Sequence, residues 1–206
     1  MRVASSITLL LLASLAAPLA QAAGTILVVG DSLSAGYGID KQRGWVALLT
    51  QRLRQEGNAY RVVNASISGD TTRGGLSRLP AALERETPEV LILALGANDG
   101  LRGFPTERTQ ENLRRMIEQA RSAGATVLLL GIKLPANYGS VYGEKFHRIY
   151  LDLADELKVA LVPFFLEGVA ETRELMQADG VHPGVEAQPR ILDNVWAGLG
   201  PLLDAR

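Results

Sequence analysis

Three residues whose types suit nucleophilic catalysis stand in two short polar segments, one near each end of the chain. Ser32 lies in the segment Gly30-Asp31-Ser32-Leu33-Ser34, and Asp179 and His182 lie in the segment Asp179-Gly180-Val181-His182-Pro183. A serine hydroxyl is a weak nucleophile until a neighbouring base accepts its proton, and histidine is the commonest base. Asp179 precedes His182 by three residues, so within one turn its carboxylate can accept the Nδ1–H bond that fixes the imidazole tautomer. The spacing predicts Ser32 as nucleophile, His182 as general base and Asp179 as the residue that orients it.

Two other residues compete for the role of base. Asp31 directly precedes the serine, but adjacent side chains diverge, which makes it a poor base and favours a role in bracing the turn. His147 lies in the helical pattern EKFHRIYLDLADEL, where a partly exposed histidine without a catalytic role is the commoner case. Ser34 is interpreted as a helix-start residue, and Pro183 suits the first turn of the last helix.

The oxyanion that forms during acyl transfer needs hydrogen-bond donors, and three groups are candidates. The backbone N–H of Ser32 is the first. Gly69 offers the second, because without a Cβ its N–H can approach a ligand closely. The side-chain amide of Asn98 offers the third. Gly69 or Asn98 alone would be interpreted as an ordinary turn residue, so their role depends on whether the fold brings them to Ser32.

Five apolar runs must position these residues, and they span residues 25–30, 60–64, 89–96, 125–132 and 160–164. The first, third and fourth runs are almost continuous in Val, Leu and Ile, which is typical of parallel strands covered on both faces. Segments with helical spacing of apolar residues separate the runs. This alternation predicts an α/β fold, a doubly wound five-stranded parallel sheet in the flavodoxin-like order 2-1-3-4-5.

Turns rich in Gly, Asn, Asp and Ser follow all five predicted strands, and parallel strands place all five at one edge of the sheet. In the order 2-1-3-4-5, strands 1 and 3 are neighbours where the winding reverses, which is where ligands bind. Ser32 and Asn98 follow these two strands. The predicted fold therefore favours a site over five unrelated polar turns.

The first 22 residues predict a signal peptide. Arg2 precedes an apolar stretch over residues 7–17, which is shorter than the ~20 residues of a membrane span, and Ala20-Gln21-Ala22 forms an A-x-A cleavage site. An N-terminal anchor helix is the alternative, which the short apolar stretch disfavours. We expect residues 1–22 to be removed and residues 23–206 to form a single exported domain.

The composition excludes several classes of partner and cofactor. With 21 basic and 22 acidic residues and 5% aromatic residues, the chain lacks the charge and the stacking side chains of a nucleic-acid-binding protein. The absence of cysteine removes a thiol nucleophile and a Cys-ligated zinc, and two histidines are too few for the usual multi-His metal site. We expect no metal, no cofactor, no transmembrane segment in the exported chain, and a monomer.

Four blocks along the chain resemble, in order, those of the SGNH (GDSL) hydrolases. They are Gly30-Asp31-Ser32-Leu33-Ser34, Gly69, Gly96-Ala97-Asn98-Asp99 and Asp179-Gly180-Val181-His182-Pro183. The four residues that name the family correspond to Ser32, Gly69, Asn98 and His182. The resemblance covers essentially all of residues 23–206 and is strongest to periplasmic members in Gram-negative bacteria. It implies a periplasmic or secreted enzyme that cleaves acyl esters and thioesters, including lysophospholipids and aryl esters.

The resemblance also implies a mobile loop after the fourth strand that shapes the acyl site, here residues 134–143. Gly139 and Gly143 would let this loop move. The predicted substrate-binding residues, whose apolar surfaces suit an acyl chain, are Leu134, Pro135, Tyr138 and Tyr142.

Two other functions remain beside a serine hydrolase. One is an exported non-catalytic α/β binding module that uses the same crevice. The other is a phosphate or nucleotide binder of flavodoxin type, which is the least favoured because no Gly-rich phosphate loop is present.

Overall fold

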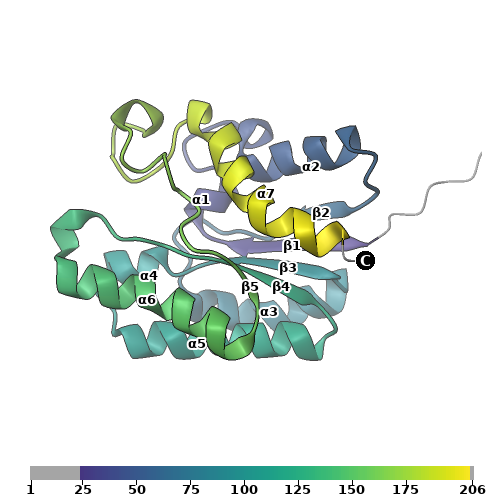
Figure 1. The fold of residues 1–206 in the computed structure, drawn as a ribbon, viewed down its shortest axis with the longest axis horizontal. Coiled ribbons are helices and arrows are strands. Elements are labelled where there is room, and N and C mark those ends of the chain that lie inside the picture. The colour runs from purple at the N-terminus through teal and green to yellow at the C-terminus, as the bar shows by residue number, and fades with distance from the viewer. Residues whose placement is uncertain (1–23, 205–206) are drawn as a thin grey trace, which may run out of the picture.

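The computed structural model describes residues 24–204 and contains a five-stranded parallel sheet between two layers of helices (Figure 1). The sheet has the order β2-β1-β3-β4-β5. This confirms the predicted doubly wound α/β fold and its strand order. The strands are β1 (Thr25–Gly30), β2 (Arg61–Asn64), β3 (Val90–Ala94), β4 (Thr126–Leu130) and β5 (Ala160–Val162).

Burial explains why three strands stood out in the sequence. Every residue of β1 and β3 is buried, as is every residue of β4 after Thr126, because helices cover both faces of the central strands. The edge strands β2 and β5 are only partly buried. Strand β5 ends at Val162 and not at Phe164, because Pro163 has no N–H to donate to a neighbouring strand.

The long helices form the two outer layers. Helices α2 and α7 cover one face of the sheet, and α3, α5 and α6 cover the other (Figure 1). Trp45, Leu49 and Leu53 form the buried face of α2 at a spacing of four residues. The long helices are α2 (Trp45–Gln55), α3 (Thr72–Glu86), α5 (Thr106–Ser122), α6 (Ser140–Leu157) and α7 (Gln188–Asp204).

Two short helices mark the point where the winding reverses. Strands β1 and β3 pair in register up to Gly30 and Ala94, so the segments after them start side by side. Helix α1 (Ser32–Ala35) follows β1, and helix α4 (Ala97–Leu101) follows β3. The fold therefore brings the Ser32 and Asn98 segments to one place at the carboxyl edge of the sheet.

The prediction for Pro183 was wrong. Helix α7 begins at Gln188, after a single 3₁₀ turn over Val185–Ala187. Pro183 instead forms an antiparallel bridge with Met176, and the N–H of Gly184 donates to the carbonyl of Leu175 at 2.7 Å. These contacts keep the segment after His182 extended, so the helix starts later.

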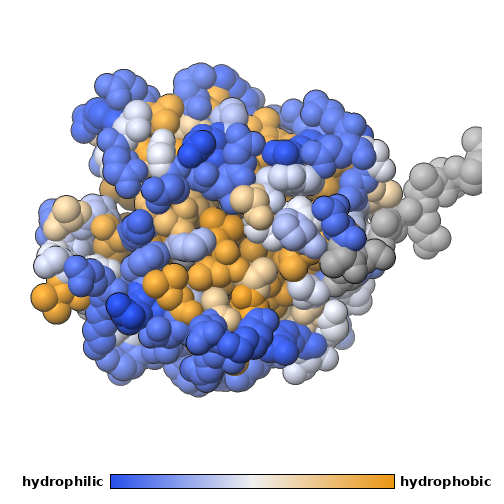
Figure 2. Space-filling view, in the orientation of Figure 1, coloured by the Kyte–Doolittle hydropathy of each residue, from blue (hydrophilic) through white to orange (hydrophobic). Residues whose placement is uncertain are grey.

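Hydrophobic side chains gather in the middle of the face seen in Figure 2, between α7 and α6, where the edge strand β5 runs. Within residues 24–204, no helix combines the length and the apolar character needed to cross a bilayer. The predicted signal peptide, residues 1–22, lies outside the described residues.

Candidate active site

Ser32, His182 and Asp179 form a continuous series of side-chain contacts. His182 Nε2 lies 2.9 Å from Ser32 Oγ, and His182 Nδ1 lies 2.7 Å from Asp179 Oδ2. Ser32 is the first residue of α1 and follows a buried strand, whereas His182 stands 150 residues later in the sequence, in the same turn as Asp179. The structure thus brings together the three residues that the sequence singled out.

The turn around Asp179 holds its carboxylate in place. Oδ1 accepts hydrogen bonds from the N–H of Val181 at 2.9 Å and of His182 at 3.0 Å, which leaves Oδ2 for the imidazole. Gly180 supplies a φ of +67° between them, a conformation that favours glycine. The His182 N–H, the His182 imidazole and the Val181 N–H together lower the pKa of Asp179 to about 2. The carboxylate is therefore ionised across the neutral range.

An aromatic side chain, that of Tyr37, also packs against the imidazole of His182. The ring of Tyr37 packs on the ring of His182 with centroids 4.4 Å apart. The carbonyl of Tyr37 accepts a hydrogen bond from Gln177 Nε2, which also donates to the carbonyl of Pro183. Sequence reasoning missed Tyr37. The only available signal was an aromatic residue five positions after Ser32.

Gly69 and Asn98 lie in adjoining turns that are linked through Asp70. Asn98 Nδ2 donates to the carbonyl of Asp70 at 2.9 Å, and Arg102 Nη2 donates to the carbonyl of Gly69 at 3.1 Å. Gly69 has a φ of +80°, a backbone conformation that favours glycine. The space around it does not add to this preference, because no described atom lies within 4 Å of where a Cβ would be. The turn after β2 and the helix after β3 are therefore held together.

A second buried link joins the same two elements. Asp99, which is 3% exposed, accepts hydrogen bonds from the N–H of Thr72 at 2.8 Å and from its Oγ1 at 2.6 Å. Thr72 begins α3, so this carboxylate fixes the start of α3 to α4. Burial raises the pKa of Asp99, and the two Thr72 bonds oppose that shift. Sequence reasoning did not assign this role to Asp99.

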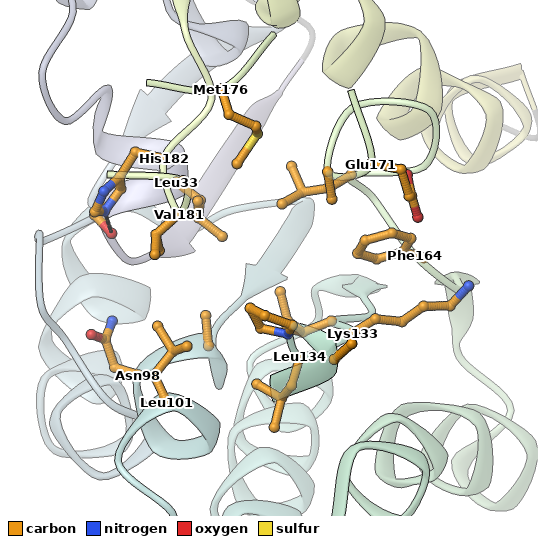
Figure 3. Close-up of a pocket in the computed structure, with 18 residues that line it drawn as sticks. Leu33, Asn98, Leu101, Lys133, Leu134, Phe164, Glu171, Met176, Val181 and His182 are labelled. Carbon is orange, nitrogen blue, oxygen red and sulfur yellow. Dashed lines mark hydrogen bonds between the residues drawn. The ribbon is translucent and has the colours of Figure 1, made fainter. Parts of the chain in front are cut away.

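A cavity of about 490 Å³ opens beside Ser32. His182 and Asn98 lie at one end of it, and Phe164, Lys133 and Glu171 lie at the other (Figure 3). Between these ends the wall is mainly apolar. The lining side chains that sequence reasoning missed include Leu33, Leu101, Ile132, Leu166, Met176 and Val181.

The segment after β4 differs from the expected loop. Leu134 and Pro135 lie in the cavity wall. Tyr138 ends a 3₁₀ turn, and Tyr142 donates from its hydroxyl to the carbonyl of Phe104; neither is among the lining residues. The loop was predicted to reach residue 143, but α6 already begins at Ser140, after Gly139 turns the chain with a φ of +82°.

The competing base His147 does not face Ser32, and the described residues form no metal site. His147 lies in α6, and its Nδ1 lies 3.1 Å from the carbonyl oxygen of Ile132. Among residues 24–204, no group of three or more histidine, aspartate or glutamate residues is arranged to hold a metal ion.

Asp31 is fully buried and braces the turn that carries Ser32. Its Oδ1 accepts a hydrogen bond from the N–H of Leu33 at 3.0 Å, which caps α1, while Oδ2 has no partner among the described residues. Burial raises the pKa of Asp31 to about 7, and the nearby charges of Asp70 and Asp99 add to this shift. Asp31 therefore holds a proton that a solvated aspartate would release near pH ~4.

We expect stability to fall between pH 5 and pH 7 because of Asp31. The folded protein retains a proton that the unfolded chain has lost, so the free energy of unfolding decreases by about 1.4 kcal/mol per pH unit from this group, and levels off above its folded-state pKa. Asp31→Asn removes the titration. Urea denaturation at pH 5, 6, 7 and 8 should show a smaller loss for the variant than for the unaltered chain.

Asp40→Asn is the matched control, because Asp40 caps a 3₁₀ turn by the same bond to a backbone N–H but is exposed. It should leave the pH dependence unchanged. An equal pH slope in the unaltered chain and the Asp31→Asn variant would contradict the assignment of this slope to Asp31.

The chain is similar to known proteins along most of its length. The profile of the GDSL-like lipase/acylhydrolase family matches residues 28–188. Esterase TesA of Pseudomonas aeruginosa is 59% identical over 182 residues, which cover 88% of this chain and 90% of that protein. Thioesterase 1/protease 1/lysophospholipase L1 of Escherichia coli is 47% identical over 185 residues, with coverages of 90% and 88%.

Solved structures are similar to the chain in fold as well as in sequence. The crystal structure of TesA superposes with a TM-score of 0.85 at 59% identity, covering 86% of this chain and 99% of that one. The psychrotrophic esterase EstA from Pseudoalteromonas sp., in a structure inhibited by monoethylphosphonate, superposes with a TM-score of 0.83 at 39% identity, with coverages of 87% and 98%.

Proposed function

The chain belongs to the GDSL-like lipase/acylhydrolase family, and we propose that it cleaves acyl esters and acyl thioesters through an acyl-enzyme formed on Ser32. The observation that carries the proposal is the unbroken series of contacts from Asp179 Oδ2 through His182 to Ser32 Oγ, at 2.7 Å and 2.9 Å. It lies at the end of a largely apolar cavity, where an acyl carbonyl would meet the serine.

The reaction follows from the positions of these atoms. Ser32 Oγ attacks the acyl carbonyl carbon while His182 Nε2 accepts its proton. Asp179 keeps the other imidazole proton on Nδ1 and stabilises the imidazolium. The tetrahedral intermediate collapses, and His182 gives its proton to the departing alcohol or thiol. A water molecule then attacks the acyl-enzyme with His182 again as base, which releases the acid and restores Ser32.

The oxyanion donors in this mechanism are the backbone N–H groups of Ser32 and Gly69 and the side-chain amide of Asn98. Their support is the arrangement of three adjoining turns, in which Asn98 Nδ2 is already held by the carbonyl of Asp70. A preorganised donor of this kind contributes about 3 kcal/mol of transition-state stabilisation.

We assign the acyl chain to the cavity. Its wall between the catalytic end and Lys133 is lined by residues such as Leu33, Leu101 and Leu134. With the acyl chain in the cavity, the leaving group would lie outside it, so we include lysophospholipids and aryl esters in the substrate class. Tyr138 and Tyr142, predicted to bind substrate, keep at most an indirect role through the segment after β4.

The proposal extends to the site of action. Residues 1–22 form a signal peptide, and residues 23–206 form one hydrolase domain that acts in the periplasm or outside the cell. The signal for export is in the sequence, in Arg2, the apolar stretch 7–17 and the Ala20-Gln21-Ala22 site.

The experiment is a series of p-nitrophenyl esters and acyl-CoA thioesters of increasing chain length, with residues 23–206 as enzyme. We expect a burst of p-nitrophenol stoichiometric with the enzyme for those esters whose acyl-enzyme forms faster than water attacks it. Each added methylene that enters the cavity should raise kcat/KM about fourfold, which corresponds to ~0.8 kcal/mol per buried CH₂. The gain should stop where the chain reaches Lys133 and Glu171.

Leu134→Ala should flatten this dependence while leaving the acetyl ester unaffected. Val141→Ala is the control, because Val141 is 83% exposed and does not line the cavity. If the unaltered enzyme hydrolysed no ester or thioester of the series, the proposed activity would be contradicted. If kcat/KM did not depend on chain length, the assignment of the acyl chain to the cavity would be wrong.

A further inference from the structure

Arg78 lies in α3, outside every motif of the sequence, yet its guanidinium contacts the ends of two strands. Nη1 donates to the carbonyl of Ala65, just after β2, and Nη2 donates to the carbonyl of Gly30, the last residue of β1, at 3.3 Å. Nε donates to Asp70 Oδ2 at 2.8 Å. Arg78 therefore uses all three of its nitrogen atoms inside the protein.

These contacts are largely shielded from water. The side chain of Arg78 is 23% exposed, and that of Asp70 is 11% exposed. The carbonyl of Gly30 also accepts a hydrogen bond from the N–H of Ile67 at 3.1 Å, so Arg78 is its second donor. A backbone carbonyl that is shielded from water, such as that of Ala65, would be costly without a partner. The planar fork of a guanidinium can serve two such carbonyls and a carboxylate at once, which a lysine ammonium cannot reproduce.

Two of the three contacts, those with Gly30 and Asp70, lead to different parts of the candidate site. Gly30 is two residues before Ser32. Asp70 directly follows Gly69, and its carbonyl accepts the hydrogen bond from Asn98 Nδ2 at 2.9 Å. One side chain thus connects the turn that carries the nucleophile with the turns that carry the two other oxyanion donors.

We propose that Arg78 is a positioning residue for the reaction, which sets the distance between Ser32 and the donors at Gly69 and Asn98. This inference rests on the proposed function. Without the guanidinium, Asp70 loses the partner of its Oδ2, and the backbone bond from Ile67 to Gly30 is left to hold this turn against β1 without this support. Because the oxyanion exists only along the reaction path, the loss falls on the transition state and leaves substrate binding nearly unchanged.

The test compares Arg78→Ala, Arg78→Lys and the control Arg85→Ala. Arg85 lies on the same helix, is exposed, and pairs only with the neighbouring Glu86 among the described residues. With p-nitrophenyl butyrate, we expect Arg78→Ala to lower kcat about 10²-fold with little change in KM, the size of effect that a displacement of ~1 Å has on catalysis. Arg78→Lys should fall between this variant and the unaltered enzyme, and Arg85→Ala should match the latter.

Two further measurements separate positioning from a general loss of structure. An alkyl trifluoromethyl ketone accepts Ser32 Oγ at its carbonyl carbon and becomes an oxyanion, so its inhibition constant should rise with Arg78→Ala as much as kcat/KM falls. The inhibition constant of a fatty amide of equal chain length, which does not react, should stay within about threefold. Added methylguanidinium should restore part of kcat in Arg78→Ala and leave the kcat of Arg85→Ala unchanged.

An unchanged kcat in Arg78→Ala would overturn the inference, as would a loss that appears only in KM or that weakens both inhibitors equally. If Arg78→Ala does not fold, Arg78→Lys decides in the same way. An unchanged kcat and an unchanged affinity for the ketone overturn the inference. A lower kcat together with weaker binding of the ketone, but not of the fatty amide, supports it. Failure of the proposed function would look different, because the unaltered enzyme itself would then not hydrolyse the ester.

Discussion

Replacing Ser32 by alanine is expected to lower kcat for p-nitrophenyl butyrate about 10⁶-fold, because the acyl-enzyme route then has no nucleophile. What remains is the weaker assistance of the oxyanion donors and substrate binding. The fold should persist, since Ser32 is only partly buried and its hydroxyl contacts His182 alone among the described residues. Steady-state hydrolysis and thermal unfolding of the variant would measure both effects.

A fluorophosphonate reagent tests the same residue without a substrate. The unaltered enzyme should gain one phosphonyl group on Ser32, and Ser32→Ala should gain none. Ser34→Ala is the matched control, because Ser34 is two residues away but is buried, with no hydrogen-bond partner for its Oγ among the described residues. Labelling that persists in Ser32→Ala, or hydrolysis at the rate of the unaltered enzyme, would leave a non-catalytic binding module as the better account.

Replacing His182 by alanine is expected to be almost as severe, with kcat again about 10⁶-fold lower, because a nucleophile without its base gains little over water. The two residues act as a unit, so the double variant with Ser32→Ala should be no slower than either single variant. Asp179→Asn should cost less, about 10⁴-fold, since the base remains but its orientation and charge balance are lost.

His147→Ala gives the decisive control, because His147 is the one other histidine in the sequence. Its Nδ1 faces the carbonyl oxygen of Ile132 and not the serine, so kcat should stay within about threefold of the unaltered enzyme. The measurement is the kcat for steady-state hydrolysis by His147→Ala and by His182→Ala. A large loss in His147→Ala together with a small loss in His182→Ala would reverse the assignment of the base.

The sequence was sufficient for the architecture because local patterns report burial. The runs that became β1, β3 and β4 are almost continuously apolar, and a strand in that state needs cover on both faces, which the two helix layers of a doubly wound sheet provide. Exact ends were less predictable. A proline ended β5 two residues early, and a bridge between Met176 and Pro183 delayed the start of α7.

Within the candidate site, the sequence determined which residue types were present and in which order along the chain. Ser32, Asp179 and His182 could be selected because their chemistry is specific and because Asp179 and His182 are neighbours in one turn. The spacing of Asp179 and His182 fixes a contact that depends on only four residues of backbone. Predictions of this kind need no knowledge of the rest of the fold.

Only the tertiary structure decided what each side chain faces. The contact of His182 with Ser32 spans 150 positions and that of Arg78 with Gly30 spans 48, so both depend on the path of the whole intervening chain. The same holds for Tyr37 against His182 and for the complete burial of Asp31. Contacts between distant segments, and the burial of a polar side chain such as that of Asp31, arise from packing among segments, and no local pattern of residues encodes them.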